Sequence, residues 1–511
     1  MPAEISSKKE VLMEEKTLKQ IMTCAQEGKY RRYPVSRELY ADAFTPVEVM
    51  RSLRAASRHC YLLESAEDRQ RWGRFSFLGY DPDMEITCTD GIMTVTEGKE
   101  EEEKKSRTFP VEHPGNVFRK ILEDYRTPAV EGLPPFTGGL VGYFSYDYIK
   151  YAEPSLKRVL SSGEGQAFRD VDLMLFNKVI VFDNYRQKLI LITGVSLTGD
   201  LENNCHRAEA ELDDMERLIR SQAKADFRPL VLKKEFHPAK GREEYTQMVE
   251  RAKEYIREGD IFQVVLSNPM TAKAEGSLFD TYRVLRTMNP SPYMFYFSSD
   301  DIEVAGASPE TLAKMVDGRV LTFPLAGTRP RGKTKEEDLA LEEELLSDEK
   351  ELSEHNMLVD LGRNDIGKIS RPGSVRVEKY LGIERFSHVM HIGSTVAGQI
   401  RGDRDSVDVV DAVLPAGTLS GAPKIRACQI IAELEEQKRG IYGGAVGYLD
   451  FTGNVDTCIS IRLAWKKNGR VCVQSGAGIV ADSIPEKEFE ECLNKAGAVL
   501  QAVRTAQGGL R

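Results

Sequence analysis

The chain has 511 residues, of which 41% are hydrophobic and 29% charged, so it can bury a large core and is long enough for about two to four domains. Its formal net charge of −10 argues against nucleic-acid binding, which requires a basic face. The eight cysteines include no C-x-x-C pair, so we expect neither a disulfide framework nor a zinc site. Free cysteines are typical of proteins in a reducing compartment. Residues 1–19 have no apolar core and no stretch has the apolar length needed to span a bilayer, so we expect a soluble, cytoplasmic protein.

The N-terminal half contains several short strand signals. Residues 84–88 and 92–96 resemble strands on either side of Asp90-Gly91, a dipeptide suited to a tight hairpin turn. Glycines and aromatic residues then alternate in 138–147, which is typical of a strand that approaches other backbone closely.

A change in composition near residue 220 indicates a linker. The charged helical pattern of residues 208–225 runs into the Pro- and Lys-bearing segment 227–238. We therefore predict an N-terminal region, 1–225, and a C-terminal region, 226–511.

The C-terminal half opens with an amphipathic helix whose apolar positions run from Tyr245 to Ile256 and which stops at Gly259. Residues 261–267 follow as a strand. Helices and strands alternate from there, but many strands are joined by short turns instead of helical crossovers. This pattern predicts an α+β fold with a mixed or antiparallel sheet, not a doubly wound one.

Two acidic helices provide candidate metal ligands. Glu351 and Glu354 are three residues apart in a helical segment, so both carboxylates lie on one face. A second acidic helix, at 486–491, could bring a partner carboxylate to the same place. Such a set fits a hard divalent cation, with Mg²⁺ as the first choice. On spacing alone, ordinary solvated helix carboxylates remain the alternative.

Three further segments suggest anion recognition. Residues 324–331 place a Gly-Thr step between apolar strand residues and two arginines, which suits a carboxylate. Residues 417–424 form a small-residue loop ending at a helix start, where backbone amides bind anions, but they lack the order of a P-loop. Residues 474–478 are a glycine-containing strand end, a weak signal because such runs are usually turns or bulges.

A final segment pair suggests a buried arginine. Residues 441–448 and 458–464 predict a hairpin whose inward positions include Tyr442 and Arg462. An arginine pointing into a sheet cavity needs an anion, either a ligand carboxylate or a buried Asp. Two anion sites beside a Mg²⁺ site together indicate an enzyme that acts on a small dicarboxylate metabolite.

Taken together, these segments resemble those of the chorismate-utilising enzymes, and most closely those of the anthranilate synthase component I family. The resemblance covers nearly all residues after 240 and, more loosely, the N-terminal half through 62–65 and 142–147. The motifs that carry it are 307–310, 324–331, 351–365, 417–424, 442–448 and 476–478.

The resemblance implies a fold and a reaction. The fold is a sandwich of large mixed or antiparallel sheets flanked by helices, with a C-terminal catalytic region and an N-terminal region that contributes to a tryptophan feedback site. The reaction is the Mg²⁺-dependent replacement of the chorismate 4-hydroxyl by ammonia at C2, followed by elimination of pyruvate to give anthranilate, in tryptophan biosynthesis.

The resemblance also assigns roles to residues. Glu354 and Glu491 would hold Mg²⁺ with Glu351 close by, and Glu310 would be the general acid that protonates the departing hydroxyl. His391, in the strand pattern 386–396, is similar to the histidine tied to pyruvate elimination, although a lone strand histidine is otherwise most often structural. The implied chorismate-binding residues are Gly327, Thr328, Thr418, Tyr442, Arg462, Gly476, Ala477, Gly478 and Lys495.

Two positions separate the branches of the family. Relatives that add water carry a lysine base where Gln263 stands, and glutamine cannot deprotonate water, which argues against isochorismate synthesis. The para-aminobenzoate branch has a lysine where Ala326 stands, so this alanine favours the ortho product.

The resemblance implies a feedback site for tryptophan. Ser65 and the stretch Pro292, Tyr293 and Met294 would lie nearest the inhibitor, and a proline-restrained loop beside Tyr and Met offers an apolar slot for an indole. Without the resemblance, a plain turn before a strand at 293–297 is the preferred interpretation.

The source of ammonia implies a partner. The sequence shows no nucleophile elbow around a cysteine with partner His and Glu, so we expect a separate glutamine amidotransferase subunit. The two subunits would form a hetero-oligomer. Dimers of such pairs, which are heterotetramers, are common in the family. The alternatives are an aminodeoxychorismate (para-aminobenzoate) synthase subunit and a regulatory protein that keeps the scaffold without turnover.

Overall fold

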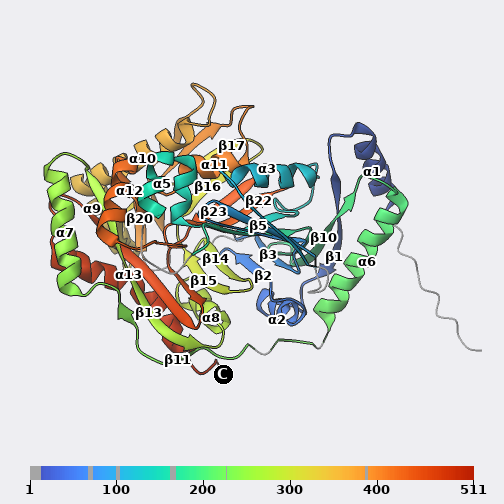
Figure 1. The fold of residues 1–511 in the computed structure, drawn as a ribbon, viewed down its shortest axis with the longest axis horizontal. Coiled ribbons are helices and arrows are strands. Elements are labelled where there is room, and N and C mark those ends of the chain that lie inside the picture. Colours follow the sequence, from blue (N-terminus) through green and yellow to red (C-terminus); the bar gives the residue numbers. More distant parts are fainter. Residues whose placement is uncertain are drawn as a thin grey trace, which may run out of the picture.

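The computed structural model describes residues 13–66, 73–98, 104–161, 168–221, 223–225, 227–385 and 389–510. In these ranges the chain forms two large sheets with helices packed around them, and all pairings between named strands are antiparallel (Figure 1). The predicted α+β fold is confirmed. None of the helices in the described ranges combines the length and apolar character needed to cross a lipid bilayer.

The first sheet has 13 strands and its two ends come from different halves of the chain. Its order is β1 (Arg32–Tyr40), β10 (Lys188–Ser196), β9 (Lys178–Asp183), β3 (Phe75–Tyr80), β2 (Cys60–Glu64), β14 (Tyr293–Ser298), β15 (Ile302–Ser308), β24 (Leu463–Lys467), β25 (Arg470–Ile479), β13 (Gln263–Glu275) and β11 (Val231–Leu232), with β12 (His237–Pro238) and β21 (Gly421–Ala422) also paired to β13.

The second sheet has 12 strands and is divided in the same way. Its order is β18 (Leu325–Pro330), β20 (Val389–Gln399), β17 (Arg319–Thr322), β16 (Thr311–Val316), β23 (Val455–Ile459), β22 (Ala445–Asp450), β7 (Gly139–Phe144), β8 (Val171–Phe176), β4 (Met84–Thr89), β5 (Ile92–Glu97) and β6 (Lys105–Pro110), with β19 (Arg376–Arg385) paired to β20.

The helices cover the outer faces and ends of the sheets. They are α1 (Glu15–Glu27), α2 (Pro46–Ala56), α3 (Gly115–Asp124), α4 (Ile149–Ala152), α5 (Lys157–Ser161), α6 (Leu201–Arg220), α7 (Arg242–Arg257), α8 (Phe279–Met288), α9 (Lys335–Ser347), α10 (Glu349–Gly367), α11 (Ser406–Val413), α12 (Lys424–Glu435) and α13 (Pro485–Ala506). In Figure 1, α1, α2 and α6 lie on one side of the molecule, whereas α7, α9, α10 and α12 lie on the other.

Aromatic side chains fill the space between the two sheets, as expected for a sandwich. Tyr61 of the first sheet contacts Phe176 of the second edge-on, with ring centroids 4.7 Å apart, and Tyr143 stacks on Phe297 at 5.9 Å. Burying such large rings provides much of the attraction between the layers.

Each sheet is continuous across the predicted boundary at 225/226. Strand β2 pairs with β14, and β7 pairs with β22, where Gly142 lies opposite Gly447. The close backbone approach predicted for 138–147 is confirmed, because a Cβ on Gly142 would collide with the carbonyl oxygen of Asp172. The two halves therefore share hydrogen-bonded sheets.

Two local predictions are confirmed. Strands β4 and β5 form a hairpin in which Asp90 and Gly91 have φ of 48° and 79°, the two positive values that a type I′ turn requires. Helix α7 covers the predicted apolar pattern, and Gly259 has φ of 84° two residues beyond its end.

The predicted hairpin of 441–448 and 458–464 is wrong in detail. The observed hairpin joins β22 to β23, and Tyr442 precedes it. The chain then leaves this sheet near Arg462, whose φ of 53° bends the backbone, and enters the other sheet as β24. Alternating hydrophobicity does not reveal that a strand changes sheets.

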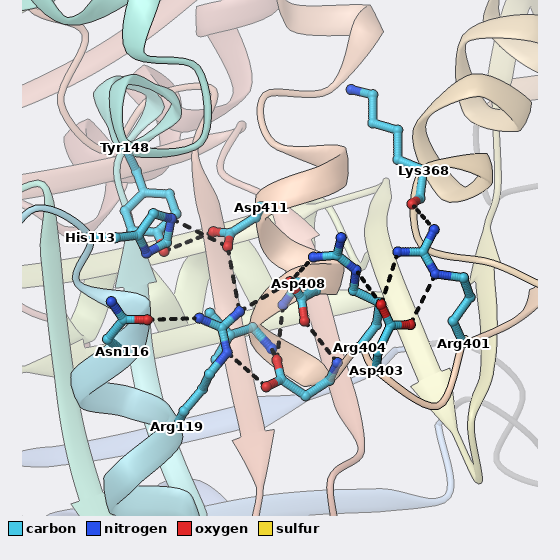
Figure 2. A network of polar contacts seen from close by, with 12 residues as sticks. His113, Asn116, Arg119, Tyr148, Lys368, Arg401, Asp403, Arg404, Asp408 and Asp411 are labelled. Atoms are coloured by element: carbon cyan, nitrogen blue, oxygen red, sulfur yellow. Dashed lines mark hydrogen bonds and ion pairs between the residues drawn. The ribbon is translucent and has the colours of Figure 1, made fainter.

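A network of ion pairs connects the two halves around α11 (Figure 2). Arg119 of α3 lies 2.7 Å from Asp405 and 3.1 Å from Asp408. The Tyr148 hydroxyl donates to Asp411 at 2.9 Å, and burial raises the pKa of Asp411 to about 7. On the far side of the network, Arg401 donates to the backbone oxygen of Lys368, just beyond α10.

The raised pKa of Asp411 predicts a specific pH dependence of stability. The folded state favours the protonated carboxyl, so this contribution is fully present below the unfolded pKa of about 3.9 and is lost as pH rises through about 7. Asp411→Asn removes this titration. When pH rises from about 4.5 to about 8, the free energy of unfolding of the wild type should therefore fall by about 2–4 kcal/mol relative to that of Asp411→Asn. Urea denaturation at both pH values measures the difference.

Asp403→Asn is the matched control, because Asp403 is 67% exposed at the other end of the same network. We expect its effect to stay below about 1 kcal/mol at both pH values. The prediction would be contradicted if the free energies of unfolding of Asp411→Asn and the wild type differed by the same amount at both pH values.

Candidate active site

A cavity of about 630 Å³ opens between α10, α13 and the ends of the strands β13, β18, β20 and β25. Asp348 caps α10 by accepting hydrogen bonds from the backbone of Lys350 and Glu351. The helix then presents Glu351, Glu354 and Leu358 to the cavity, at the spacing of one helical face.

The cavity brings together almost every residue predicted for the catalytic site. The predicted residues that line it are Glu310, His391, Glu351, Glu354, Glu491, Gln263, Ala326, Gly327, Thr328, Thr418, Tyr442, Arg462, Gly476, Gly478 and Lys495.

Ala477 is the exception. Side chains alternate along β25, so Gly476 and Gly478 face the cavity while the methyl group of Ala477 packs into the core behind the strand and is fully buried. The period of the strand could have separated Ala477 from its neighbours.

Besides Glu310, four carboxylates from two helices lie in the walls of the cavity. Glu351 and Glu354 come from α10, and Glu488 and Glu491 come from α13, each pair three residues apart. Burial, followed by the charge of Glu354, raises the pKa of Glu351. Burial raises the pKa of Glu488, and the charge of Glu491 adds to this.

This donor set fits a hard divalent cation, because a positive ion would favour the ionised form of carboxylates whose pKa values burial and neighbouring negative charge raise. Glu488 was missed by sequence reasoning, although it lies three residues before Glu491 in the same acidic run. Lys495 Nζ lies 2.6 Å from Glu491, as the one-turn spacing suggests.

A tighter group of possible metal ligands exists elsewhere in the described chain. Ligand atoms of His59, Glu85 and Asp300 lie within 4.8 Å of one another. They lie outside the cavity, and Arg169 already pairs with Glu85 at 3.1 Å. We interpret this group as part of an ion-pair network.

Glu310 follows β15 at the floor of the cavity. Thr418 Oγ1 donates a hydrogen bond to its carboxylate at 3.1 Å. Burial raises the pKa of Glu310 to about 7, against the smaller opposite effects of Thr418 and Lys495. A carboxyl that keeps its proton near neutral pH can act as a general acid.

His391 lies on β20, and residues 386–388 of the predicted strand fall outside the described ranges. Its Nδ1 lies 2.8 Å from the carbonyl oxygen of Gly327 and 3.1 Å from Thr328 Oγ1. A carbonyl oxygen can only accept, so Nδ1 carries the hydrogen and Nε2 is the basic nitrogen. Burial, followed by the charge of Arg462, lowers the pKa of His391 and favours the neutral ring.

Arg462 projects from the bend between the two sheets. It donates to the backbone oxygen of Lys495 at 2.5 Å, and burial lowers its pKa. Within the described ranges it forms no ion pair with a carboxylate, so the buried-Asp alternative is not observed. A guanidinium in this position suits a ligand carboxylate.

The family model of chorismate binding enzymes matches residues 58–501. The chain belongs to this enzyme family. Curated relatives support the assignment: anthranilate synthase component 1 of Acetivibrio thermocellus is 43% identical over 96% of this chain and 98% of its own length, and that of Aquifex aeolicus is 42% identical over 94% and 96%.

Solved structures agree with the family assignment. Anthranilate synthase component I from Streptococcus pneumoniae superimposes with a TM-score of 0.73 at 38% identity, covering 84% of this chain and 92% of that one. The menaquinone-specific isochorismate synthase of Escherichia coli shares the fold, with a TM-score of 0.66 at 19% identity over 95% of this chain and 99% of that one.

The two arginines and the lysine of the chorismate-family motifs have structural partners instead of facing the cavity. Arg329 pairs with Glu344 at 2.9 Å, and Arg331 pairs with Asp338 at 2.6 Å. Neither arginine lines the cavity, whereas Gly327 and Thr328 of the same segment do, so the Gly-Thr step is the part of 324–331 that can meet a ligand. Lys424 is also engaged, with Asp365, at 2.7 Å.

A separate cavity lies at the junction of β2 and β14, and Ser65, Pro292, Tyr293 and Met294 all line it. The backbone of Ala66 donates to Ser291 at 3.0 Å, which joins the two predicted elements across the two halves. The structure thus brings together all four residues predicted for the tryptophan site.

This second cavity is connected to Glu310. The Tyr293 hydroxyl donates to Asp456 at 2.7 Å and accepts from Thr311 Oγ1 at 3.0 Å. Thr311 directly follows Glu310, and Tyr293 lies opposite Ser308 in the β14–β15 ladder. Any displacement of Tyr293 would therefore act within two residues of Glu310.

Proposed function

We propose that this chain is the large, catalytic subunit of an anthranilate synthase, which converts chorismate and ammonia to anthranilate and pyruvate in tryptophan biosynthesis. The observation that carries the proposal is a single cavity that holds four helix glutamates, the acid Glu310 with a raised pKa, the base His391 with a lowered pKa, and Arg462, which forms no ion pair with a carboxylate of the described residues. The names of the curated relatives support it.

The positive and amide groups of the cavity suit a substrate with two carboxylates. Arg462 and the Tyr442 hydroxyl would bind one carboxylate, with the backbone of Gly476 and Gly478 beside them. Glu354 and Glu491, with Glu351 and Glu488 close by, would hold Mg²⁺. When bound, the ion supplies positive charge that neutralises the ring carboxylate and helps to orient the ring.

Glu310 would act in the first step. Ammonia attacks C2, the ring double bonds shift, and the bond between C4 and its hydroxyl oxygen breaks. Hydroxide is a poor leaving group, so the Glu310 carboxyl donates its proton to this oxygen and water departs.

His391 would act in the second step. Loss of the proton at C2 and cleavage of the C3–O bond make the ring aromatic and release enolpyruvate, which takes up a proton to become pyruvate. Neutral His391, with Nδ1 fixed by Gly327, offers a basic nitrogen for this proton transfer.

The nucleophile is expected to be ammonia rather than water. Gln263 lines the cavity, and its Oε1 is buried without a hydrogen-bond partner in the described chain. An amide oxygen can accept a hydrogen bond from ammonia but cannot serve as a base for water.

The ammonia would come from a separate glutamine amidotransferase subunit. All eight cysteines are free, six of them are buried, and none lines the cavity among the described residues. A nucleophilic cysteine for glutamine hydrolysis thus has no candidate here. Free thiols also suit the reducing cytoplasm that we expect for this enzyme. The heterotetramer of two such pairs stays a prediction.

Aminodeoxychorismate synthesis is the second candidate function. It uses the same substrate, so product analysis after incubation of the chain with chorismate, Mg²⁺ and ammonium sulfate separates the two. Ala326 in the cavity wall favours anthranilate. The absence of any aromatic product would instead favour the regulatory alternative.

The metal site generates the first test of this proposal. Glu354→Gln removes one negative ligand, so we expect kcat/KM for chorismate to fall by at least about 100-fold and the Mg²⁺ concentration for half-maximal rate to rise. Glu349→Gln, at the start of the same helix and outside the cavity, is the control and should behave as wild type. An unchanged rate in Glu354→Gln would refute the metal assignment.

The acid generates the second test. Glu310 must be protonated, so activity should fall as pH rises through about 7 when the concentration of unprotonated ammonia is held constant. Glu310→Gln should lower kcat by about 100-fold to 10,000-fold. Thr418→Val removes the hydrogen bond that lowers this pKa, so its activity limit should move to higher pH. A pH limit identical to that of the wild type would contradict the assignment.

We also propose that tryptophan binds in the cavity of Ser65, Pro292, Tyr293 and Met294 as a feedback inhibitor. The cavity combines apolar walls with the polar groups of Asp456 and Lys314. Tyr293 would transmit the occupation of this cavity to Glu310 through Thr311.

Feedback variants should fall into two classes. Ser65→Arg and Pro292→Leu alter the cavity wall and should weaken both tryptophan binding and inhibition. Tyr293→Phe keeps the ring but removes the hydroxyl shared with Asp456 and Thr311, so binding should persist while inhibition weakens. Calorimetry gives the affinity for tryptophan, and the steady-state assay gives inhibition. If all three variants are inhibited by tryptophan as strongly as the wild type, the proposed tryptophan site is wrong.

A further inference from the structure

Another, smaller cavity lies behind Glu310, and we call it the rear chamber. Its volume is about 40 Å³. It shares Glu310, Leu358 and Thr418 with the 630 Å³ cavity, so these three residues form the partition between the two spaces. The catalytic acid thus faces the substrate on one side and the rear chamber on the other.

Two walls of the rear chamber come from α10 and from the end of α11 with the segment that follows it, and the remaining walls come from 310–312, 322–324 and Ile459. Leu358, Leu361 and Asp365 follow at helical spacing, so the face of α10 that carries Glu354 near its start carries Asp365 near its end. The network around α11 in Figure 2 holds both walls from outside, since Arg119 pairs with α11 and Arg401 reaches the end of α10.

The rear chamber has the size and polarity to hold water. One water needs about 10–15 Å³ of such volume, so about two or three can fit. The polar groups that could bond them are Glu310, Thr311, Thr322, Asp365 and Thr418, and the remaining walls are mostly apolar. Waters in this space would therefore connect Glu310 to Asp365.

Asp365 is a second carboxylate in the wall of the rear chamber and is 8% exposed. One of its oxygens lies 2.7 Å from Lys424 Nζ, which also donates to the carbonyl oxygen of Val413 at 3.1 Å. Its other oxygen lies 3.6 Å from Nζ of Lys368, whose side chain is 50% exposed. The carboxylate is thus fixed by a buried cation and lies close to bulk water.

The proposed amination creates a need for such a connection. Each turnover transfers the Glu310 proton to the oxygen leaving C4, which departs as water and leaves Glu310 ionised. The incoming ammonia releases its own proton at C2, a different ring carbon. Glu310 must therefore regain a proton from solvent before the next substrate can react.

We propose that the rear chamber is a water-filled path that returns a proton to Glu310, and that Asp365 is the positioning residue that orders its waters. The proposal rests on the proposed function. The proton comes from bulk solvent and passes along the waters, while Asp365 neither contacts the substrate nor changes its own bonds.

The test compares the first turnover with later ones. Asp365→Asn keeps the side-chain volume but removes the negative charge, and rapid-quench kinetics with chorismate, Mg²⁺ and ammonium follow anthranilate formation. Glu310 in the resting enzyme is protonated below about pH 7, so the first turnover at about pH 6 should stay within about twofold of wild type. Steady-state turnover should fall by about tenfold, which gives a burst equal to the enzyme concentration.

Lys424→Met is the matched control, because it breaks the same ion pair but leaves the Asp365 carboxylate in the rear chamber. We expect a loss of stability without a burst. Equal slowing of the first and later turnovers in Asp365→Asn would assign it a purely structural role and overturn the proposal, and so would a burst of equal size in Lys424→Met.

Thr322→Val provides a second variant if Asp365→Asn does not fold. It removes one hydroxyl of the rear chamber at nearly constant volume, and a smaller burst is expected. If Thr322→Val shows no burst, the proposal is overturned. Failure of the wild-type chain to form anthranilate from ammonium would instead reject the proposed function, so the two failures are distinguishable.

Discussion

The burial of two pairs of glutamates in one cavity is the constraint on which the site depends, because burial and the charge of the neighbouring glutamate raise the pKa of Glu351 and of Glu488. Glu351 and Glu354 on α10 and Glu488 and Glu491 on α13 cannot move apart, because each pair belongs to a long helix packed on a sheet. The arrangement is favourable only with positive charge nearby, from Lys495 on one side and from the proposed Mg²⁺ on the other. The geometry that raises the pKa of Glu351 and Glu488 thus suits the cavity to a cation.

Burial has opposite consequences for the two proton-transfer groups of the cavity. It disfavours the charged form of each group, so the pKa of Glu310 rises to about 7 while the pKa of His391 falls. Near neutral pH one group therefore keeps a proton to donate and the other keeps a site to accept one. The same physical effect, burial in one cavity, therefore sets the protonation of an acid and of a base.

The shared sheets provide a route for the feedback inhibition that we propose, because they connect the N-terminal region to the C-terminal cavity. Strands β2 and β14 pair across the halves and form one wall of the proposed tryptophan cavity, and β15, next to β14, leads directly to Glu310. The Tyr293 hydroxyl adds a side-chain connection to Thr311. A rigid, hydrogen-bonded sheet is a short route between the two cavities.

The sequence by itself determined the features that depend on local geometry. Helical spacing placed Glu351 and Glu354 on one face, Asp90-Gly91 indicated its hairpin, and the family motifs indicated the residues that converge on the cavity, apart from Ala477. Only the tertiary structure decided that the strand after Arg462 changes sheets, that Arg329 and Arg331 pair with helix carboxylates, and that Asp365 borders a chamber behind Glu310. The reason is physical: backbone periodicity is set by near neighbours in the chain, whereas burial, pKa and ion pairing are set by groups that lie far away in sequence and meet only when the sheets and helices pack.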